Sequence, residues 1–533
     1  MDRRRPALSA ALRVAAPLVP AAFLALFFAY PLASILERGL TRDGGLDLPF
    51  DVLDDPHTLR VAWFTVWQAA VSTALTLAAG LPLAWATARV AYSGRALVRA
   101  LVVVPFVLPT IVVATAFLTL LPERWERGVL PILAAHVFFN VAVVVRLVGG
   151  YWAALDPRLG DAAATLGASP LRRVREVTLP ALAPALAAAA SLVFLFSFTS
   201  FGVVVVLGGP ARATLEAEIY YAAARAFDLR TAAALALLQL AAVAILVIVA
   251  GMLERRAGTA LPLAPERTAV RRPRGAERGL LAAALGGGLL LLGLPLGALV
   301  LRSLSTPDGL GLRFYRRLLE ETPALLVPPW QAIGWSLAFA GAGTMLAVGL
   351  GASIAVAVAR RRANWLDAAA MLPLGASAVM LGFGFLIAFD EAPLDLRRSW
   401  WLVPLAQSLV AAPFVVRALL PALRSIDVRL REAAAVLGAP PARVWREIDL
   451  PLAARALAAA AGLAFAVCLG EFGATVFLAR AERPTLPVAI FRFLGRPGAE
   501  NQGAAAALSV VLMLLAAAAV LVAERGASRR SAS

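Results

Sequence analysis

A few polar side chains lie inside long apolar stretches of this chain, and these are the ones that could act on a solute. Glu471 lies twenty residues after Pro451, about 30 Å along a helix that rises about 1.5 Å per residue. An ionisable group inside a membrane segment is costly and usually faces a cavity or a partner. Its charge could attract a cationic solute, whereas an ion pair with an arginine or a place near the outer surface would be a purely structural role.

His136 and Asn140 form a second candidate pair. They lie one helical turn apart and would share one face of a helix. They are candidates for lining a solute pathway, although an interhelical hydrogen bond is the simpler explanation.

Other kinds of chemistry are excluded by residues that are missing or scarce. All 50 basic residues are arginine, so no lysine is present for a phosphate-binding loop of the G-x-x-x-x-G-K-[ST] type. The one cysteine, Cys468, supports no internal disulfide, and two histidines are too few for a histidine-built metal site. We therefore expect no catalytic residues, no metal site and no cofactor bound by this chain.

Apolar runs long enough to cross a membrane recur along the whole sequence. The chain is 61% hydrophobic and 16% charged, with a mean hydropathy of +0.80, whereas soluble domains carry about 25% charged residues. We expect an all-α polytopic membrane protein in a lipid bilayer, with twelve spans at residues 16–35, 61–88, 100–121, 129–149, 181–207, 231–252, 280–301, 333–359, 366–388, 401–420, 452–479 and 503–522.

The arginines predict the orientation of these spans. They gather in alternate loops, as expected for cytoplasmic loops, and the first loop on the other side holds six carboxylates. The net charge of +17 is therefore interpreted as a topology signal and not as a nucleic-acid surface. The pattern predicts that both termini are cytoplasmic.

A polar loop occurs twice, 271 residues apart and without a gap. Residues 161–180 read DAAATLGASPLRRVREVTLP, and residues 432–451 read EAAAVLGAPPARVWREIDLP. Loops usually drift in sequence, so this repeat predicts a docking surface. The candidate coupling residues are Asp161, Ala162, Ala163, Gly167, Arg175 and Pro180 in the first copy, and Glu432, Ala433, Ala434, Gly438, Arg446 and Pro451 in the second.

Each copy predicts a helix-turn-helix elbow. An alanine-rich helix opens with Asp161 or Glu432, because a carboxylate suits a helix N-terminus. Gly167 or Gly438 then permits a sharp turn, and proline restarts a short helix that leads into the next span. Such an elbow could transmit a push from a cytosolic partner.

The same offset relates other parts of the chain and defines two parallel halves. The prediction is a first domain at 1–262 with its loop at 156–184, a cytoplasmic linker at 263–279, and a second domain at 280–533 with its loop at 427–455. The halves differ at one candidate pathway position, where Ser200 corresponds to Glu471. Phe201 and Phe472 follow these two residues and are further pathway candidates.

The repeated loop resembles the EAA loop of bacterial binding-protein-dependent ABC importer permeases, E-A-A, three residues, G, then I-x-L-P. The second copy matches from Glu432 to Pro451, and the first has Asp161 for Glu and Val177 for Ile. A later family proline is present as Pro184 but is replaced by Arg455, which leaves the start of that span open.

The resemblance implies the type I permease fold in the bacterial inner membrane. It also implies the partners: two copies of a cytosolic ABC ATPase subunit, which bind ATP and Mg²⁺, and a periplasmic solute-binding protein. In the family, the elbow inserts into a groove on the ATPase.

Fused permeases of this size occur in the iron(III) and thiamine branch of the family. The stretches 136–140 (HVFFN), 197–209 and 214–220 resemble thiamine permeases, while LGEFG at 469–473 resembles the L-G-D-F-G element shared with iron(III) permeases. Thiamine is the expected substrate and iron(III) the alternative.

Two other classes of function stay open at this stage. An ion-coupled secondary transporter also uses duplicated halves, but it would require more ionisable residues at mid-membrane and would not require two elbows. A membrane-embedded enzyme is disfavoured because the chain has no H-E-x-x-H sequence and no nucleophile elbow.

Overall fold

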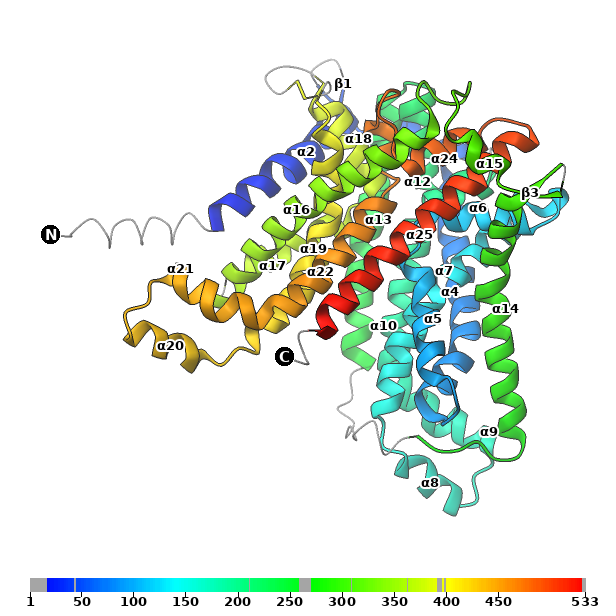
Figure 1. The fold of residues 1–533 in the computed structure, drawn as a ribbon, viewed down its shortest axis with the longest axis vertical. Helices are drawn as coiled ribbons and strands as arrows, with labels where there is room; N and C mark the ends of the chain where they lie inside the picture. Colours follow the sequence, from blue (N-terminus) through cyan, green and yellow to red (C-terminus); the bar gives the residue numbers. More distant parts are fainter. Residues whose placement is uncertain are drawn as a thin grey trace. The chain divides into compact units, whose positions relative to one another are not determined.

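The computed structural model describes residues 17–42, 45–209, 211–257, 270–307, 309–361, 363–390, 395–396 and 399–529. These residues are almost entirely helical, and the ribbon in Figure 1 consists of long helices joined by short ones. Residues 263–269 of the predicted linker and the arginines of the N-terminal tail lie outside the described residues.

Ten helices in the described part are long and apolar enough to cross a membrane. They are Pro17–Leu40, Pro56–Arg89, Val129–Ala154, Pro170–Phe198, Leu229–Leu253, Ala276–Leu304, Pro329–Arg360, Leu402–Arg424, Pro441–Gly470 and Ala499–Ala523. The all-α polytopic fold is thereby confirmed.

The two remaining predicted spans, 100–121 and 366–388, are each broken into a bent pair of helices. Arg95–Val107 and Thr110–Leu120 meet at 102°, and Trp365–Gly375 and Ala378–Ala388 meet at 95°. The first break has a local cause, because Leu108 precedes Pro109 and is extended, as residues before proline usually are. The number of spans is twelve if each pair counts as one.

The helices and strands in chain order are η1 (Ala25–Ala29), α2 (Tyr30–Leu40), β1 (Thr41–Arg42), β2 (Gly45–Leu46), α3 (Phe50–Leu53), α4 (Pro56–Arg89), α5 (Arg95–Val107), α6 (Thr110–Leu120), η2 (Glu123–Trp125), α7 (Val129–Ala154), α8 (Arg158–Thr165), α9 (Pro170–Arg173), η3 (Val174–Thr178), α10 (Leu179–Phe198), α11 (Gly202–Leu207), α12 (Leu215–Tyr220), η4 (Tyr221–Arg225) and α13 (Leu229–Ala257). They continue with α14 (Ala276–Leu304), β3 (Ser305–Thr306), β4 (Gly309–Leu310), α15 (Arg313–Arg317), α16 (Pro329–Arg361), α17 (Asn364–Gly375), α18 (Ala378–Ala388), α19 (Leu402–Arg424), α20 (Val428–Val436), α21 (Pro441–Val444), η6 (Trp445–Asp449), α22 (Leu450–Gly470), α23 (Thr475–Leu478), α24 (Leu486–Leu494) and α25 (Ala499–Arg529).

The chain divides into two compact units. One comprises residues 51–218 and 238–305, and its core is the packing of α4, α7 and α10 on one another. The other comprises residues 1–50, 219–237 and 306–533, and its core is the corresponding packing of α16, α19 and α22.

A hydrogen bond that occurs in both units supports the duplication. The hydroxyl of Thr65 on α4 accepts from the backbone N–H of Leu215 at 3.0 Å. The hydroxyl of Ser336 on α16 accepts from the backbone N–H of Leu486 at 2.6 Å. Both residues of the second bond lie 271 positions after those of the first, so the offset found in the loops also holds inside the membrane helices.

The first helix of each sequence half packs in the unit formed mainly by the other half. In one unit, the helix Pro17–Leu40 packs through α2 on α18, where Gly384 leaves room for Pro31. In the other unit, α14 packs on α6 and α4, where Gly288 lies against Leu83. The compact units therefore exchange the first helix of each half, and residues 219–237 also belong to the unit formed mainly by the second half. The boundaries of the predicted domains 1–262 and 280–533 stay a prediction.

The described end of the linker is bound to the first half. Residues 89–91 pair with Arg271 through backbone hydrogen bonds of 3.0 and 2.9 Å. The Arg271 guanidinium donates to the Glu277 carboxylate at 2.7 Å, and this hydrogen bond raises the pKa of Arg271 above its usual value.

Candidate functional site

The first repeated loop folds into a helical elbow, formed by α8, a turn and α9. Gly167 has a φ of +80°, which a glycine adopts without strain. Its N–H donates to the Ala164 carbonyl and that of Ala168 donates to the Ala163 carbonyl, both at 3.0 Å. This pair of bonds is a Schellman motif, which satisfies the last carbonyls of α8 and turns the chain sharply.

The second loop repeats this geometry between α20 and α21. Gly438 has a φ of +78°, and the N–H groups of Gly438 and Ala439 donate to the carbonyls of Ala435 and Ala434, both at 3.0 Å. Nothing lies within 4 Å of the place where a Cβ would be at either glycine. The glycines are therefore required by the backbone conformation and not by lack of space.

The start of each elbow differs from the sequence expectation. The helix does not open at Asp161 or Glu432 but a few residues earlier, at the first residues of α8 and α20. The carboxylates of Asp156 and Asp427 accept from the backbone N–H groups of Arg158 and Arg429, each at 2.9 Å. Asp427 is the N-cap residue of α20, and Asp156 lies one residue before the N-cap Pro157 of α8, so each short side chain reaches an N–H group at the start of its helix.

The second arm of each elbow runs without a break into a membrane helix. The helical runs Pro170–Phe198 and Pro441–Gly470 each begin with proline and contain a π-helical turn at the same place, η3 in the first and η6 in the second. An exposed ion pair is repeated as well, Arg172 with Glu176 and Arg443 with Glu447, both at 2.9 Å. Displacing an elbow would therefore move a membrane helix directly.

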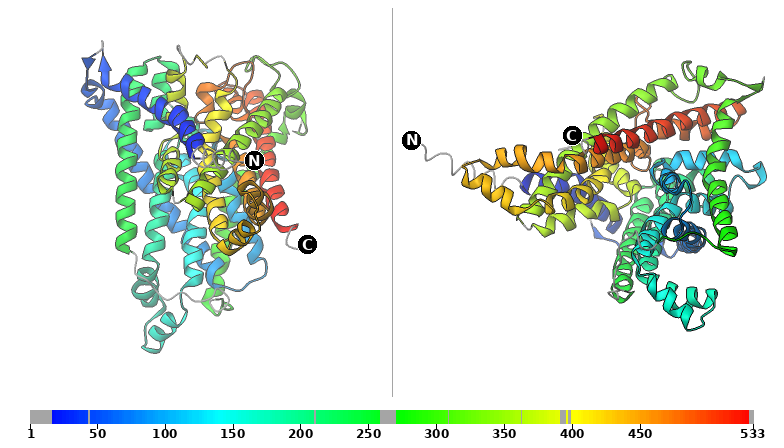
Figure 2. Two further views of the ribbon diagram at one scale, coloured as in Figure 1. Left: turned by 90° about the vertical axis from the view of Figure 1, so that its left-hand side faces the viewer. Right: turned by 60° about the horizontal axis from the view of Figure 1, so that its bottom comes forward.

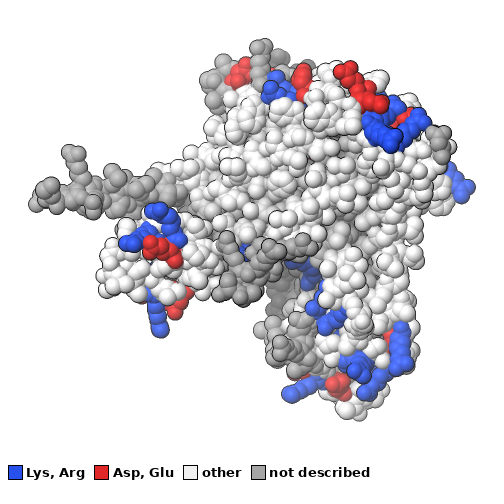
Figure 3. All heavy atoms as spheres, in the orientation of Figure 1, with Lys and Arg blue, Asp and Glu red and all other residues white. Residues whose placement is uncertain are grey.

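The elbows are largely exposed to solvent. Each carries a leucine at its tip, Leu166 and Leu437, and both are 87% exposed. Figure 3 shows charged side chains gathered over the elbows and an almost uncharged surface along the helices, and Figure 2 shows both elbows extending from the helix ends. Most of the predicted coupling residues are exposed and the rest are partly exposed: Asp161, Ala162, Ala163, Gly167, Arg175, Pro180, Glu432, Ala433, Ala434, Gly438, Arg446 and Pro451.

Glu471 lies at the break between α22 and α23 and is 6% exposed. Its carboxylate accepts from the backbone N–H groups of Ala474 at 2.7 Å and Thr475 at 3.0 Å. The structure thus gives this side chain a local task, because it caps the short helix α23. A role in the pathway stays a prediction.

Ser200 lies at the corresponding break between α10 and α11 and is 9% exposed. Phe201 and Phe472 are buried beside these breaks, and the Phe472 ring packs on Phe491 with centroids 5.3 Å apart. Each half therefore interrupts its long helix at the candidate pathway position.

His136 and Asn140 lie in a buried polar cluster where α4, α7 and α10 meet. The Nδ1 atom of His136 lies 3.0 Å from the Ser72 hydroxyl, and the Asn140 amide donates to the Ser197 hydroxyl at 3.3 Å. The Gln68 amide donates to the Ser197 carbonyl at 2.8 Å. The interhelical hydrogen bonds considered from the sequence are present.

Sequence reasoning missed Gln68, Ser72 and Ser197 as members of this cluster. It also missed Asp449, which is fully buried beside the second elbow. The signal for Asp449 was present, because the first copy has Thr178 where the second has this acid. In the described part of the chain, no group of three or more His, Cys, Asp or Glu residues could hold a metal ion.

Comparisons with known proteins agree with this geometry. The family described as binding-protein-dependent transport system inner membrane component matches the chain twice, over residues 77–259 and 343–530. Each match contains one elbow.

Relatives extend the similarity to nearly the full length. The thiamine transport system permease protein ThiP of Brucella abortus (strain 2308) is 30% identical over 527 residues, covering 94% of this chain and 92% of that protein. ThiP of Escherichia coli (strain K12) is 27% identical, covering 86% and 87%. The molybdenum transport system permease protein ModB of Haemophilus influenzae is 34% identical over 195 residues, which is 33% of this chain and 85% of that shorter protein.

Proposed function

This chain belongs to the binding-protein-dependent transport system inner membrane components and is a permease subunit of an ABC importer, and from that premise we propose that it imports thiamine by ATP-driven alternating access. Two cytosolic ATPase subunits bind the two elbows, one each, and a periplasmic binding protein delivers the solute. ATP and Mg²⁺ are bound by the ATPase subunits, because this chain has no lysine for a phosphate-binding loop. Membership of this family supports an ABC importer over the alternatives of an ion-coupled secondary transporter and a membrane-embedded enzyme.

The observation that carries the proposal is the repeated elbow. Two elbows with the same glycine turn, the same exposed ion pair and the same exposed tip leucine suit two identical partners. A single exposed leucine is common on protein surfaces and needs no explanation. Two leucines at equivalent tips are what is expected if each inserts as an apolar anchor into a groove on an ATPase subunit. The continuous helical run from each elbow into the membrane supplies the mechanical connection.

The direction of transport follows from the proposed topology. The arginine pattern favours elbows on the cytoplasmic side and both termini inside. The acidic first loop and Glu471 would then lie toward the periplasm, where negative charge favours a cationic solute such as thiamine.

Leu166→Asp and Leu437→Asp test the docking role. We expect each variant to weaken co-purification with the partner ATPase, and the double variant to abolish it, because a buried charge in an apolar groove is costly. Leu46→Asp and Leu310→Asp are matched controls, since these leucines are 80% and 74% exposed but lie in the β1–β2 and β3–β4 hairpins. Equal retention of the ATPase by elbow and hairpin variants would contradict the proposal.

Substrate identity is tested separately. Proteoliposomes with the ATPase and ATP in the lumen and the binding protein outside should take up labelled thiamine. Uptake of ferric iron instead of thiamine would support the iron(III) alternative.

A further inference from the structure

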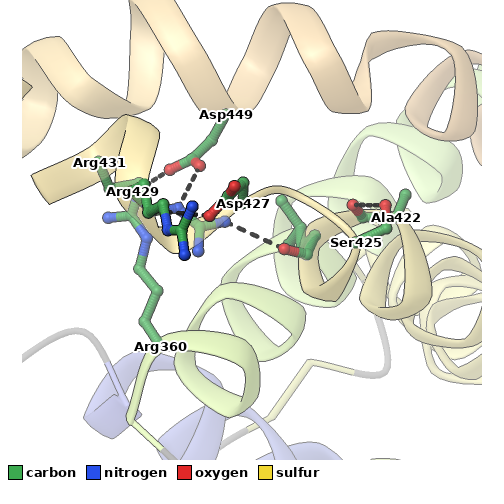
Figure 4. Close-up of polar contacts among 8 residues, drawn as sticks. Arg360, Ala422, Ser425, Asp427, Arg429, Arg431 and Asp449 are labelled. Atoms are coloured by element: carbon green, nitrogen blue, oxygen red, sulfur yellow. Dashed lines mark hydrogen bonds and ion pairs between the residues drawn. The ribbon is translucent and has the colours of Figure 1, made fainter. Parts of the chain in front are cut away.

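The two elbows differ at one buried carboxylate. Asp449 ends the π-helical turn η6 and is fully buried. Its Oδ1 atom accepts from the Arg431 Nε atom of α20 at 2.7 Å, and its Oδ2 atom accepts from Arg360 at the end of α16. Figure 4 shows both guanidinium groups turned toward this carboxylate. We call Arg360, Arg431 and Asp449 the Asp449 cluster.

The Asp449 cluster joins the elbow to several helices of its bundle. Arg431 also donates to the Leu423 carbonyl at 3.0 Å, near the end of α19. The Arg360 guanidinium lies over the Trp445 ring, 5.7 Å from its centroid. The elbow helix α20 is thereby tied to α16, α19 and the start of the α22 run by charge-assisted hydrogen bonds, which are stronger than neutral ones.

The first elbow lacks this arrangement. The residues at the positions of Asp449 and Arg431 are Thr178 and Gly160, neither of which can form an ion pair. Only the third position keeps its charge, as Arg89, which donates to the neutral carbonyl of Leu155 at 3.0 Å. Within the described residues, the first elbow has no buried carboxylate at this place, although α8 packs on η3 and the carboxylates of Asp156 and Asp161 attract Arg89 electrostatically.

We propose that Asp449 is a positioning residue that locks the second elbow to its helix bundle, so that the two elbows transmit ATPase movement with unequal stiffness. The consequence for transmitting ATPase movement rests on the proposed function. A movement of α20 passes directly to α16 and α22 through the Asp449 cluster. A movement of α8 passes to the α10 run through the Gly167 turn and through its packing on η3, without a buried charged connection.

The locking itself can be measured without an ATPase. We expect Asp449→Asn in the full chain, in lipid nanodiscs, to make amide hydrogen exchange in residues 428–436 at least about tenfold faster, because removing one partner of a buried ion cluster is strongly destabilising. Exchange in residues 158–165 should not change. Glu447→Gln is the matched control, since Glu447 lies on the same turn but forms only an exposed ion pair.

Equal exchange in Asp449→Asn and Glu447→Gln would overturn the proposal. If Asp449→Asn does not fold, Arg431→Gln removes the connection from the elbow side and is judged by the same criterion. The reverse change is also informative: Gly160→Arg with Thr178→Asp supplies the missing charges beside Arg89. It should slow exchange in residues 158–165, and unchanged exchange there would count against the proposal.

The transport consequence is measured with the ATPase and binding protein in proteoliposomes. Asp449→Asn should retain ATPase association and ATP hydrolysis but move severalfold less solute per ATP, whereas Leu310→Asp, on the exposed β3–β4 hairpin, should match the wild type. If Asp449→Asn lowered uptake only by lowering the amount of protein, the solute moved per ATP would be unchanged. That result would contradict the positioning role. If the wild-type chain binds no ATPase at all, the proposed function fails, while the exchange result still decides the locking.

Discussion

At the scale of single residues, Glu471 offers the sharpest test. Its carboxylate caps α23 through two backbone hydrogen bonds. Glu471→Gln keeps an oxygen that can accept one of them and removes the charge. We therefore expect Glu471→Gln to assemble normally and to take up thiamine severalfold more slowly, because the negative charge near the pathway is lost. The measurement is initial uptake in proteoliposomes, normalised to the amount of ATPase bound.

A second variant separates the charge from the cap. Glu471→Leu leaves two buried N–H groups without an acceptor, at a cost of about 1–3 kcal/mol each, so it should also lower the thermal midpoint. Ser200→Ala, at the equivalent position of the other half, should change neither quantity. Wild-type uptake by Glu471→Gln would show that the carboxylate serves only as a cap.

The residues that the sequence predicted share a local signal. Glu471, His136 and Asn140 stand out because polar groups are rare in apolar segments, and all three are buried. The burial of Asp449 could not be predicted in the same way. Its partners lie 18 and 89 positions away in the chain, and only the fold places them beside it.

At the scale of elements, each elbow depends on its glycine turn. Gly167 and Gly160 both have open space for a methyl group, but only Gly167 has a positive φ. Gly167→Ala should therefore destabilise the elbow by about 1 kcal/mol, and Gly160→Ala, inside α8, should stabilise it by about 0.5–1 kcal/mol.

The two alanine variants should thus shift hydrogen exchange in residues 158–168 in opposite directions. About 1 kcal/mol corresponds to about a fivefold change in the population of the open state. Shifts of the same sign would mean that space or docking contacts, and not the backbone conformation, determine the need for Gly167.

The sequence predicted these elbows well because their determinants are local: glycine, proline and capping residues within one short segment. The cap itself was misplaced, since a carboxylate inside the first turn and one just before it look alike in a sequence. The first bend had a local signal in Pro109 that was not used, but the second was missed for a different reason. Hydropathy measures how apolar a segment is, and it does not change where Ala376 leaves the helix between α17 and α18.

At the scale of the whole molecule, the duplication was predictable but the exchange of helices was not. The apolar helix Pro17–Leu40 has no sequence feature that distinguishes its own half from the other as a partner. Its place on α18 comes from shape, with Gly384 close to Pro31 and the rings of Phe27 and Phe389 5.8 Å apart. Such complementarity drives helix packing in membranes, where apolar burial alone does not select a partner.

The exchange makes a prediction about dividing the chain. Fragments 1–262 and 263–533 each contain one elbow, but the first lacks the α14 that covers α4 and α6, and the second lacks the helix that covers α18. Expressed alone, each fragment should aggregate or lose thermal stability in detergent, as judged by size-exclusion chromatography. Expressed together, they should co-purify and restore uptake, because each supplies the helix that the other lacks. A monodisperse single fragment as stable as the full chain would show that the exchanged helices are dispensable for folding. The fusion of the two halves into one chain would then have to be explained by the pairing of the elbows alone.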